Sequence, residues 1–516
     1  MPMFPWEIFA LFSFLGLVGI LNHAMWRDEL NVWLIVRDSV SWQDLIANIK
    51  YEGHPALWYF CLAVLNQLTD APIVMKLLHF CIAVGSAFLF LFYSPFSRLK
   101  KILFIFGYLP FYEYFLISRN YAFSLLFVFA FCALFKSRKR SYLGLASALF
   151  FLANSNAYGL LLSFALFMTL VADYCWQKKS LASVNYPKLA DILTSIGVYG
   201  AGLFLSLWMI IPPLDSQLKG GLTQWFLAWD FHHLMKVLSR LWSSYILLLI
   251  PGDSHVLGVT FFGLFSVIIF LGFISVLLRK PIPLLFYVLG TLELWAFTYT
   301  KFLGSPRHYG YLFIVLIVAL WLSFYYPSNH FLPQQLYLRT QKHFPTVWRF
   351  YQWSCQRKNT VILIILIAQL ISGITAFGRD LIVPFSAGRA TAAYLKQENL
   401  DQMFLVGSED FAMATISGYL NKKIYYPETQ QLGSFVLFDL QRQQKINWEV
   451  IAEVRSLLNR PDLSEVLLIV NYELKIEPRL NVEAIAQFTH SFIHNEKYYL
   501  YRVTKSSGVE RTPELN

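Results

Sequence analysis

Charged residues are scarce in this sequence. Only 14% of its 516 residues are Asp, Glu, Lys or Arg, whereas a soluble domain carries about 25%. Hydrophobic residues make up 57% of the chain and aromatic residues 18%, and so many apolar side chains cannot all be buried in one soluble core. The composition excludes an ordinary soluble protein and predicts an α-helical polytopic membrane protein.

Several familiar motifs are also missing. The five cysteines lie in or beside apolar segments, without the spacing of a disulfide framework or a thiolate metal site. Neither GxGxxG nor GxxxxGK occurs, so no nucleotide site is predicted. We find no internal repeat and no low-complexity stretch. The N-terminal apolar run carries Glu7 where a signal peptide has basic residues, and no small-residue cleavage site follows, so we expect a retained first helix.

Apolar segments are what the chain has in abundance. A helix needs roughly 20 apolar residues to cross about 30 Å of hydrocarbon. About eleven segments meet or approach that length: 7–25, 73–93, 101–118, 119–135, 142–157, 158–176, 190–211, 256–278, 282–300, 309–326 and 359–378.

Charge in the loops predicts the orientation. The loops 94–101, 136–140, 177–188, 279–280 and 327–358 together contain 17 Lys and Arg and no Asp or Glu. Because basic loops stay in the cytoplasm, we expect a multi-pass protein of the plasma (inner) membrane with a cytoplasmic N-terminus and an extracytoplasmic C-terminus. The net charge of +11 is spread over these loops, so membrane lipids are expected partners and nucleic acid is not.

Two further segments are amphipathic or too short to span. We predict interfacial helices at about 30–69 and at 229–249, because counting 56–69 as a span would place every basic loop outside. Residues 1–379 then form the transmembrane domain.

The tail, 380–516, is richer in charge and alternates short apolar runs with polar helical stretches. We predict a small extracytoplasmic α/β domain there. Its expected strands are 403–406, 424–426, 435–439, 466–470 and a pair within 487–505, and its expected helices are 388–399, 409–420 and 447–458.

Two adjacent carboxylates, Asp28 and Glu29, follow the first span in TrpArgAspGluLeuAsn (26–31). They could supply a general base or bind a divalent cation, and the alternative is an acidic, solvated loop. Neighbouring side chains on a helix diverge by roughly 100°. At most one of the two therefore acts directly, and the other orients it or coordinates an ion.

Further ionisable residues fall on the outer half of the predicted spans. Glu113 and Arg119 flank the outer end of the third span, Lys76 lies in the second, and Arg307 stands in SerProArgHisTyrGlyTyr (305–311). Ionisable residues at membrane depth are costly and usually pair or serve a site. Three cations from different helices would suit a lipid-linked phosphate. The alternatives are a structural Glu113–Arg119 pair, an Arg119 that snorkels to phosphate headgroups, and an Arg307 that anchors the membrane interface.

The order of these motifs resembles a known family. AspGlu after the first helix, GlyHisPro (53–55) before an interfacial helix, a cation early in the second span and ArgAsnTyr (119–121) after the third are similar to the GT-C superfamily. The likeness is to its protein O-mannosyltransferase and aminoarabinose-transferase branch. It is clearest over 20–135, weaker at 305–312 and faint in the tail.

The resemblance implies a GT-C-like fold and a glycosyltransferase that moves a sugar from a polyprenyl-phosphate-linked donor, usually with inversion. Asp28 would be the base that deprotonates an acceptor hydroxyl, Glu29 would support it, and Glu113 would match an acidic position of the second outer loop. Many members have an aspartate nearer the following helix. The substrate-binding residues would be His54, Lys76, Arg119, Tyr121, Arg307 and His308.

Several alternatives stay open at this point. Some relatives use a divalent metal cation, and no certain ligand set for one stands in the sequence. His54 could instead be structural. The acceptor could be a glycan, a lipid or a protein. A polytopic transporter or lipid flippase is the competing function, since intramembrane charges also line transport paths, although no inverted repeat supports it. A noncatalytic scaffold for an envelope complex is the third hypothesis.

Overall fold

The computed structural model describes residues 4–180, 187–218, 225–250, 252, 255–327, 341, 343–474 and 480–505. Within these residues, nine helices are long and apolar enough to cross a membrane, as a multi-pass membrane protein requires. They are α1 (Phe4–Asn22), α5 (Ile73–Tyr93), α7 (Tyr121–Leu134) extended by η3 (Phe135–Lys139), α9 (Ala157–Ser180), α10 (Leu189–Ile210), α12 (Val256–Leu277), α13 (Pro281–Thr300), α14 (Pro306–Tyr309) with α15 (Tyr311–Ser323), and α17 (Pro345–Ile382).

The two other predicted spans contain shorter helices. The segment 142–157 contains α8 (Leu143–Ala153), and 101–118 contains α6 (Arg98–Ile105) followed by the π-helix η2 (Tyr108–Glu113). Gly107 and Pro110 interrupt the second of these, because proline lacks the N–H that a continuous α-helix needs. The chain forms a wider π-helical turn there in place of a continuous α-helix, and the Tyr114 N–H donates to the Leu109 carbonyl at 2.9 Å.

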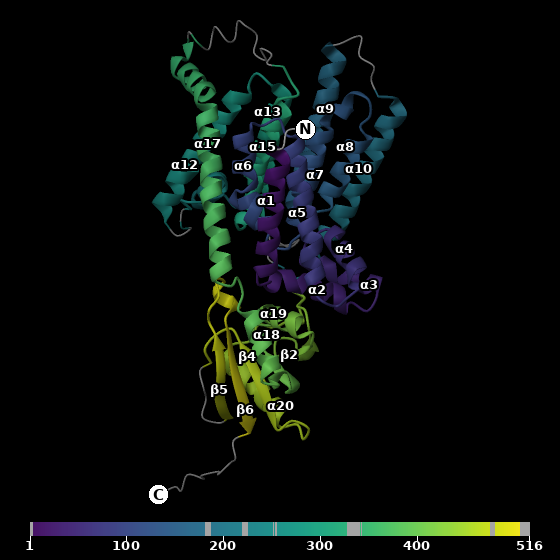
Figure 1. Cartoon of the computed structure of the whole chain (residues 1–516), viewed down its shortest axis with the longest axis vertical. Coiled ribbons are helices and arrows are strands. Elements are labelled where there is room, and N and C mark those ends of the chain that lie inside the picture. The colour runs from purple at the N-terminus through teal and green to yellow at the C-terminus, as the bar shows by residue number, and fades with distance from the viewer. Residues whose placement is uncertain are drawn as a thin grey trace.

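The segment between the first two long helices folds into several short helices. These are α2 (Arg27–Asp38), α3 (Trp42–Ile49), η1 (Lys50–Glu52) and α4 (Leu57–Asn66). The second predicted interfacial segment contains α11 (Phe231–Tyr245). Figure 1 shows α2, α3 and α4 gathered at the end of the helical bundle that faces the C-terminal sheet.

The C-terminal part contains a six-stranded mixed sheet in the order β3-β2-β1-β4-β6-β5. Strands β2, β1 and β4 are parallel, and the remaining pairings are antiparallel. The strands are β1 (Leu405–Gly407), β2 (Ile424–Tyr426), β3 (Gln431–Gly433), β4 (Glu465–Val470), β5 (Leu480–Phe488) and β6 (Tyr498–Lys505). Helices α18 (Gly388–Gln397) and α19 (Asp410–Leu420) share one buried cluster with the sheet, and α20 (Asn447–Leu458) packs into the other.

The predicted strand at 435–439 is wrong. Its backbone does not join the sheet, because the groups that a ladder would use are bound elsewhere. The Val436 N–H donates to the Asn31 side chain at 2.9 Å, and the Phe438 carbonyl accepts from the Gln217 N–H at 2.7 Å. This apolar segment therefore fastens the sheet domain to the helical part of the chain.

The sheet domain lies directly against α2. Helix α19 packs on α2, and Gly418 makes the close approach possible, since a Cβ there would lie only 3.0 Å from the Leu30 side chain. Figure 1 shows α18 and α19 between the sheet and the helical bundle. The helix that carries Asp28 and Glu29 is thus held between the membrane helices and the C-terminal domain.

Candidate active site

The two predicted carboxylates stand in the first turn of α2. Trp26 is extended, and its N–H donates to the Glu29 carboxylate at 3.2 Å, so Glu29 caps the helix that contains it. Negative charge at a helix N-terminus is favoured by the helix dipole. As predicted from the 100° helical step, the two side chains diverge, and each has its own partners.

Asp28 faces two arginines from other parts of the chain. The Arg307 Nη1 lies 3.1 Å from its Oδ2, and Arg119 donates from Nη1 to its backbone carbonyl. Arg27 lies 3.8 Å from Oδ1, and the Asp28 side chain remains 31% exposed. Burial would raise the pKa of Asp28, but the charges of Arg307, Arg119 and Arg27 hold it below its usual value. Asp28 is therefore ionised at neutral pH and accessible, as a general base must be.

Glu29 belongs to a separate, buried network. Its Oε1 accepts from the Ser118 N–H at 2.7 Å, and its Oε2 lies 3.1 Å from His23 Nε2. On the other side, His23 Nδ1 lies 2.7 Å from Asp380 Oδ2. Burial would lower the pKa of His23, which lies just beyond α1, but the two carboxylates raise it to about 9. The charged imidazole joins the start of α2 to the end of α17.

Lys76 also belongs to this network. Its Nζ donates to the His23 carbonyl at 2.6 Å, and its side chain is only 3% exposed. The expectation that Lys76 would converge with Arg119 and Arg307 is therefore wrong. Lys76, one helical turn inside α5, extends instead toward the buried network of His23 and Glu29.

Glu113 is the second carboxylate near Arg307. Its Oε2 accepts from the Tyr108 hydroxyl at 2.6 Å, and its Oε1 lies 3.9 Å from Arg307 Nε. The guanidinium of Arg307 also covers the Trp26 ring, at 5.0 Å from its centroid. The alternative Glu113–Arg119 pair does not form, since Glu113 pairs with Arg307.

The remaining predicted residues are His54, Tyr121 and His308, and they lie near Arg119 and Arg307. Arg119 Nη2 lies 3.4 Å from His54 Nε2, and the Tyr121 hydroxyl lies 2.8 Å from His308 Nε2. Burial, and next the Arg119 charge, lower the pKa of His54 to about 3, so this imidazole is neutral at physiological pH. Of the nine predicted site residues, all except Glu29 and Lys76 thus lie around Arg307 and Arg119.

Glu52 was not among the predicted site residues. Its carboxylate accepts from Asn31 at 3.1 Å and from the Tyr59 hydroxyl at 3.3 Å. Burial raises its pKa to about 7, opposed by Arg119 and aided by the negative charge of Asp28. The signal in the sequence was its position two residues before His54 in the segment TyrGluGlyHisPro (51–55).

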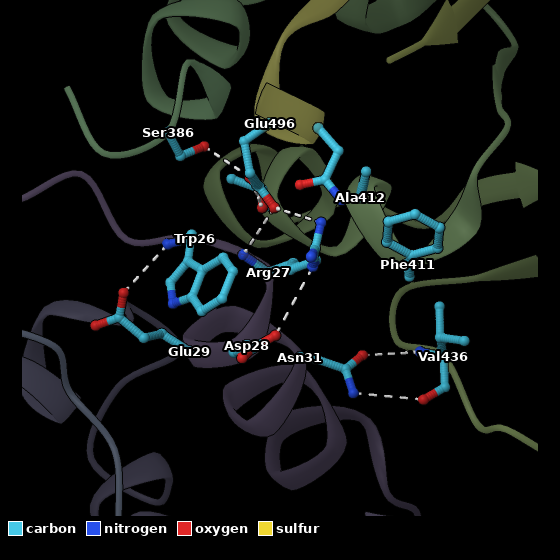
Figure 2. A network of polar contacts seen from close by, with 12 residues as sticks. Trp26, Arg27, Asp28, Glu29, Asn31, Ser386, Phe411, Ala412, Val436 and Glu496 are labelled. Carbon is cyan, nitrogen blue, oxygen red and sulfur yellow. Dashed lines mark hydrogen bonds and ion pairs between the residues drawn. The ribbon is translucent and has the colours of Figure 1, made fainter. Parts of the chain in front are cut away.

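The sheet domain contributes a buried carboxylate to the same helix turn, as Figure 2 shows. Glu496 Oε1 accepts from the Arg27 N–H at 3.3 Å and lies 3.7 Å from Arg27 Nη1. Its Oε2 accepts from Ser386, Thr415 and Tyr498. Arg27 is thus placed between Glu496 and Asp28, with the Phe411 ring 4.8 Å from its guanidinium. Sequence reasoning missed Glu496 because 469 residues separate it from Arg27.

Across the described residues, no group of three or more His, Cys, Asp or Glu side chains is arranged to hold a metal ion. Asp28 has an arginine as its counter-charge in this arrangement. What the described geometry offers is an ionised, accessible carboxylate beside two guanidinium groups, which suits a base next to an anion.

Comparison with known proteins gives one informative likeness. ArnT from Cupriavidus metallidurans, solved in complex with undecaprenyl phosphate, superimposes with a TM-score of 0.52. The match covers 97% of this chain and 98% of ArnT at 9% sequence identity. No protein-family model and no curated protein matches the sequence. At 9% identity the likeness shows the fold alone: over nearly its whole length the chain shares the fold of ArnT.

Proposed function

We propose that the protein is a membrane glycosyltransferase that moves a sugar from a polyprenyl-phosphate-linked donor to an acceptor hydroxyl. The observation that carries this proposal is the ionised, partly exposed Asp28 carboxylate beside Arg307 and Arg119. A base and a pair of phosphate-binding cations are the two elements that this reaction needs. The likeness to ArnT, which was solved with undecaprenyl phosphate bound, supports the lipid class of the donor.

The chemical step follows from the placement of these groups. Asp28 accepts the proton of the acceptor hydroxyl while the hydroxyl oxygen attacks the anomeric carbon of the sugar. The bond between that carbon and the phosphate oxygen breaks, and both electrons leave with the polyprenyl phosphate. Attack from the face opposite the phosphate inverts the anomeric carbon. The leaving group is already anionic, so it needs electrostatic stabilisation rather than a proton, and Arg307 and Arg119 supply it.

Donor binding competes with an interaction already present. Arg307 pairs with Asp28 at 3.1 Å. A donor phosphate would compete with Asp28 for the N–H groups of that guanidinium. Asp28 would then lose part of its counter-charge while Arg119 and Arg27 stay beside it, and its carboxylate would become a stronger base when the donor is in place. The proposal contains no metal-dependent step, and the divalent cation expected for some relatives stays a prediction.

The proposed location is the plasma (inner) membrane with the site on the extracytoplasmic face. The basic loops favour this orientation. Helix α2 and the sheet domain lie together at one end of the bundle, so an outward-facing sheet domain implies an outward-facing Asp28. The acceptor, whether glycan, lipid or protein, would meet the donor there.

The test is sugar transfer in proteoliposomes from a panel of radiolabelled polyprenyl-phosphate sugars to membrane acceptors. The native protein should release free polyprenyl phosphate and label an acceptor. The double variant Arg119→Gln/Arg307→Gln should bind the polyprenyl phosphate at least about tenfold more weakly. Arg98→Gln, which removes an arginine stacked on Phe4 in another part of the chain, is the matched control. Movement of intact donor across the bilayer without cleavage would replace this proposal with a flippase.

A further inference from the structure

A second charged site lies among the membrane helices, away from Asp28. A pocket of about 200 Å³ opens between α6, α12, α15 and α17. We call it the lysine pocket, because three lysines line it: Lys100 of α6, Lys280 before α13, and Lys358 of α17. All three belong to the basic loops 94–101, 279–280 and 327–358, so the pocket opens at the end of the bundle predicted to be cytoplasmic.

The walls of the lysine pocket are apolar. They include Phe104, Leu277, Ile317, Leu320, Ile362 and Leu366. These side chains come from four helices, and Leu277, Ile317 and Leu366 are at most 3% exposed. A soluble anion gains nothing from such walls, whereas a hydrocarbon chain does.

The three positive charges have no acidic partner in the pocket. No carboxylate stands among the described residues that line it. Lys100 donates to the Asn359 side chain at 2.9 Å, and Lys280 donates to the Ser323 carbonyl. Burial lowers the pKa of Lys280, and so does the nearby charge of Lys358. Convergent like charges are unfavourable unless an anion joins them.

Topology alone does not account for this arrangement. Lysines at cytoplasmic helix ends are common, but that rule needs no convergence. Lys136 and Lys139 stand at the same predicted side, and neither lines the pocket. The pocket combines charge and apolar walls in the pattern that anionic lipid headgroups occupy between membrane helices.

We infer that the lysine pocket binds an anionic phospholipid, with its phosphate among Lys100, Lys280 and Lys358 and an acyl chain along the apolar walls. This site is independent of the proposed transferase reaction. Because the pocket is bounded by α6, α12, α15 and α17, the bound lipid would join helices that are far apart in the sequence.

The experiment is native mass spectrometry of the full chain in detergent, titrated with phosphatidylglycerol or with phosphatidylcholine of identical acyl chains. We expect the native protein to bind the first lipid at one site at least about tenfold more tightly. The variant Lys100→Gln/Lys280→Gln/Lys358→Gln should lose that preference. The control Lys136→Gln/Lys139→Gln/Lys178→Gln removes the same charge from other basic segments and should keep it.

A second variant separates a built pocket from diffuse attraction. Val276→Trp fills the lined space without changing charge and should weaken phosphatidylglycerol binding about as much as the triple lysine variant. Full phosphatidylglycerol binding by Val276→Trp would show that the lipid does not occupy the lysine pocket. Equal losses of binding in both triple variants would show the same. Displacement of the lipid by millimolar inorganic phosphate would show a soluble-anion site and overturn the lipid assignment. Unchanged thermal unfolding midpoints keep each comparison valid.

Discussion

The His23 network allows a stability prediction with a defined pH window. His23 is fully buried and lies between Asp380 at 2.7 Å and Glu29 at 3.1 Å. Burial opposes protonation, but the two carboxylates raise the pKa of His23 from 6.5 to about 9. A pKa difference of roughly 2.5 corresponds to about 3 kcal/mol of folding free energy. Because the folded pKa lies above the unfolded one, this stabilisation is complete below pH 6.5 and is lost as pH rises through about 9.

The perturbation is His23→Gln, which keeps hydrogen-bonding capacity and removes the charge. We expect its thermal unfolding midpoint in detergent to lie several degrees below that of the native protein at pH 6, with the gap closing by pH 10. The exposed His490→Gln serves as the control and should follow the native curve at every pH. A His23→Gln curve that runs parallel to the native curve from pH 6 to pH 10 would refute a charged His23 in the fold.

Three further predictions concern the candidate site. Arg307→Gln removes the cation nearest the Asp28 carboxylate, so the pKa of Asp28 should rise. The acid side of the pH profile of kcat/KM should then move to higher pH. An unchanged acid side would show that Arg307 does not set the pKa of Asp28. Glu52→Gln removes a carboxyl group whose pKa is raised by burial to about 7. An inflection near pH 7 should therefore vanish from the pH profile of kcat/KM. An inflection that persists in the variant would belong to another group. Glu496→Gln removes the charge that holds Arg27, which is 21% exposed, so kcat should fall roughly fivefold, equivalent to about 1 kcal/mol. The donor KM of Glu496→Gln should stay within twofold of the native value, and Glu496→Asp should recover part of kcat. An unchanged kcat in Glu496→Gln would limit Glu496 to a structural role.

The features predicted correctly from the sequence are those with a local signal. Helix α20 has the predicted bounds, 447–458, and β2 has the predicted bounds, 424–426. Apolar periodicity and length carry this information within a few residues. The long membrane helices follow for the same reason, and the divergence of Asp28 and Glu29 follows from helix geometry.

The features that were missed depend on contacts between distant segments. The segment 435–439 has the composition of a strand, but Asn31 binds the backbone of Val436 from α2. Lys76 was expected beside Arg307, yet it lies against His23 because Glu29 is buried there. No local pattern distinguishes these outcomes, since each depends on how two remote segments pack.

We propose that Asp28 is the base of a sugar transfer. The direct measurement is the turnover of a polyprenyl-phosphate sugar by native protein and by Asp28→Asn, with donor binding measured in parallel. Asp70→Asn, which changes an exposed carboxylate of the same outer segment, is the control. We expect Asp28→Asn to lose at least about a hundredfold in turnover. It should bind donor as tightly as native protein or more so, because Arg307 is released from its ion pair. Turnover by Asp28→Asn at the native rate would show that Asp28 is not the base.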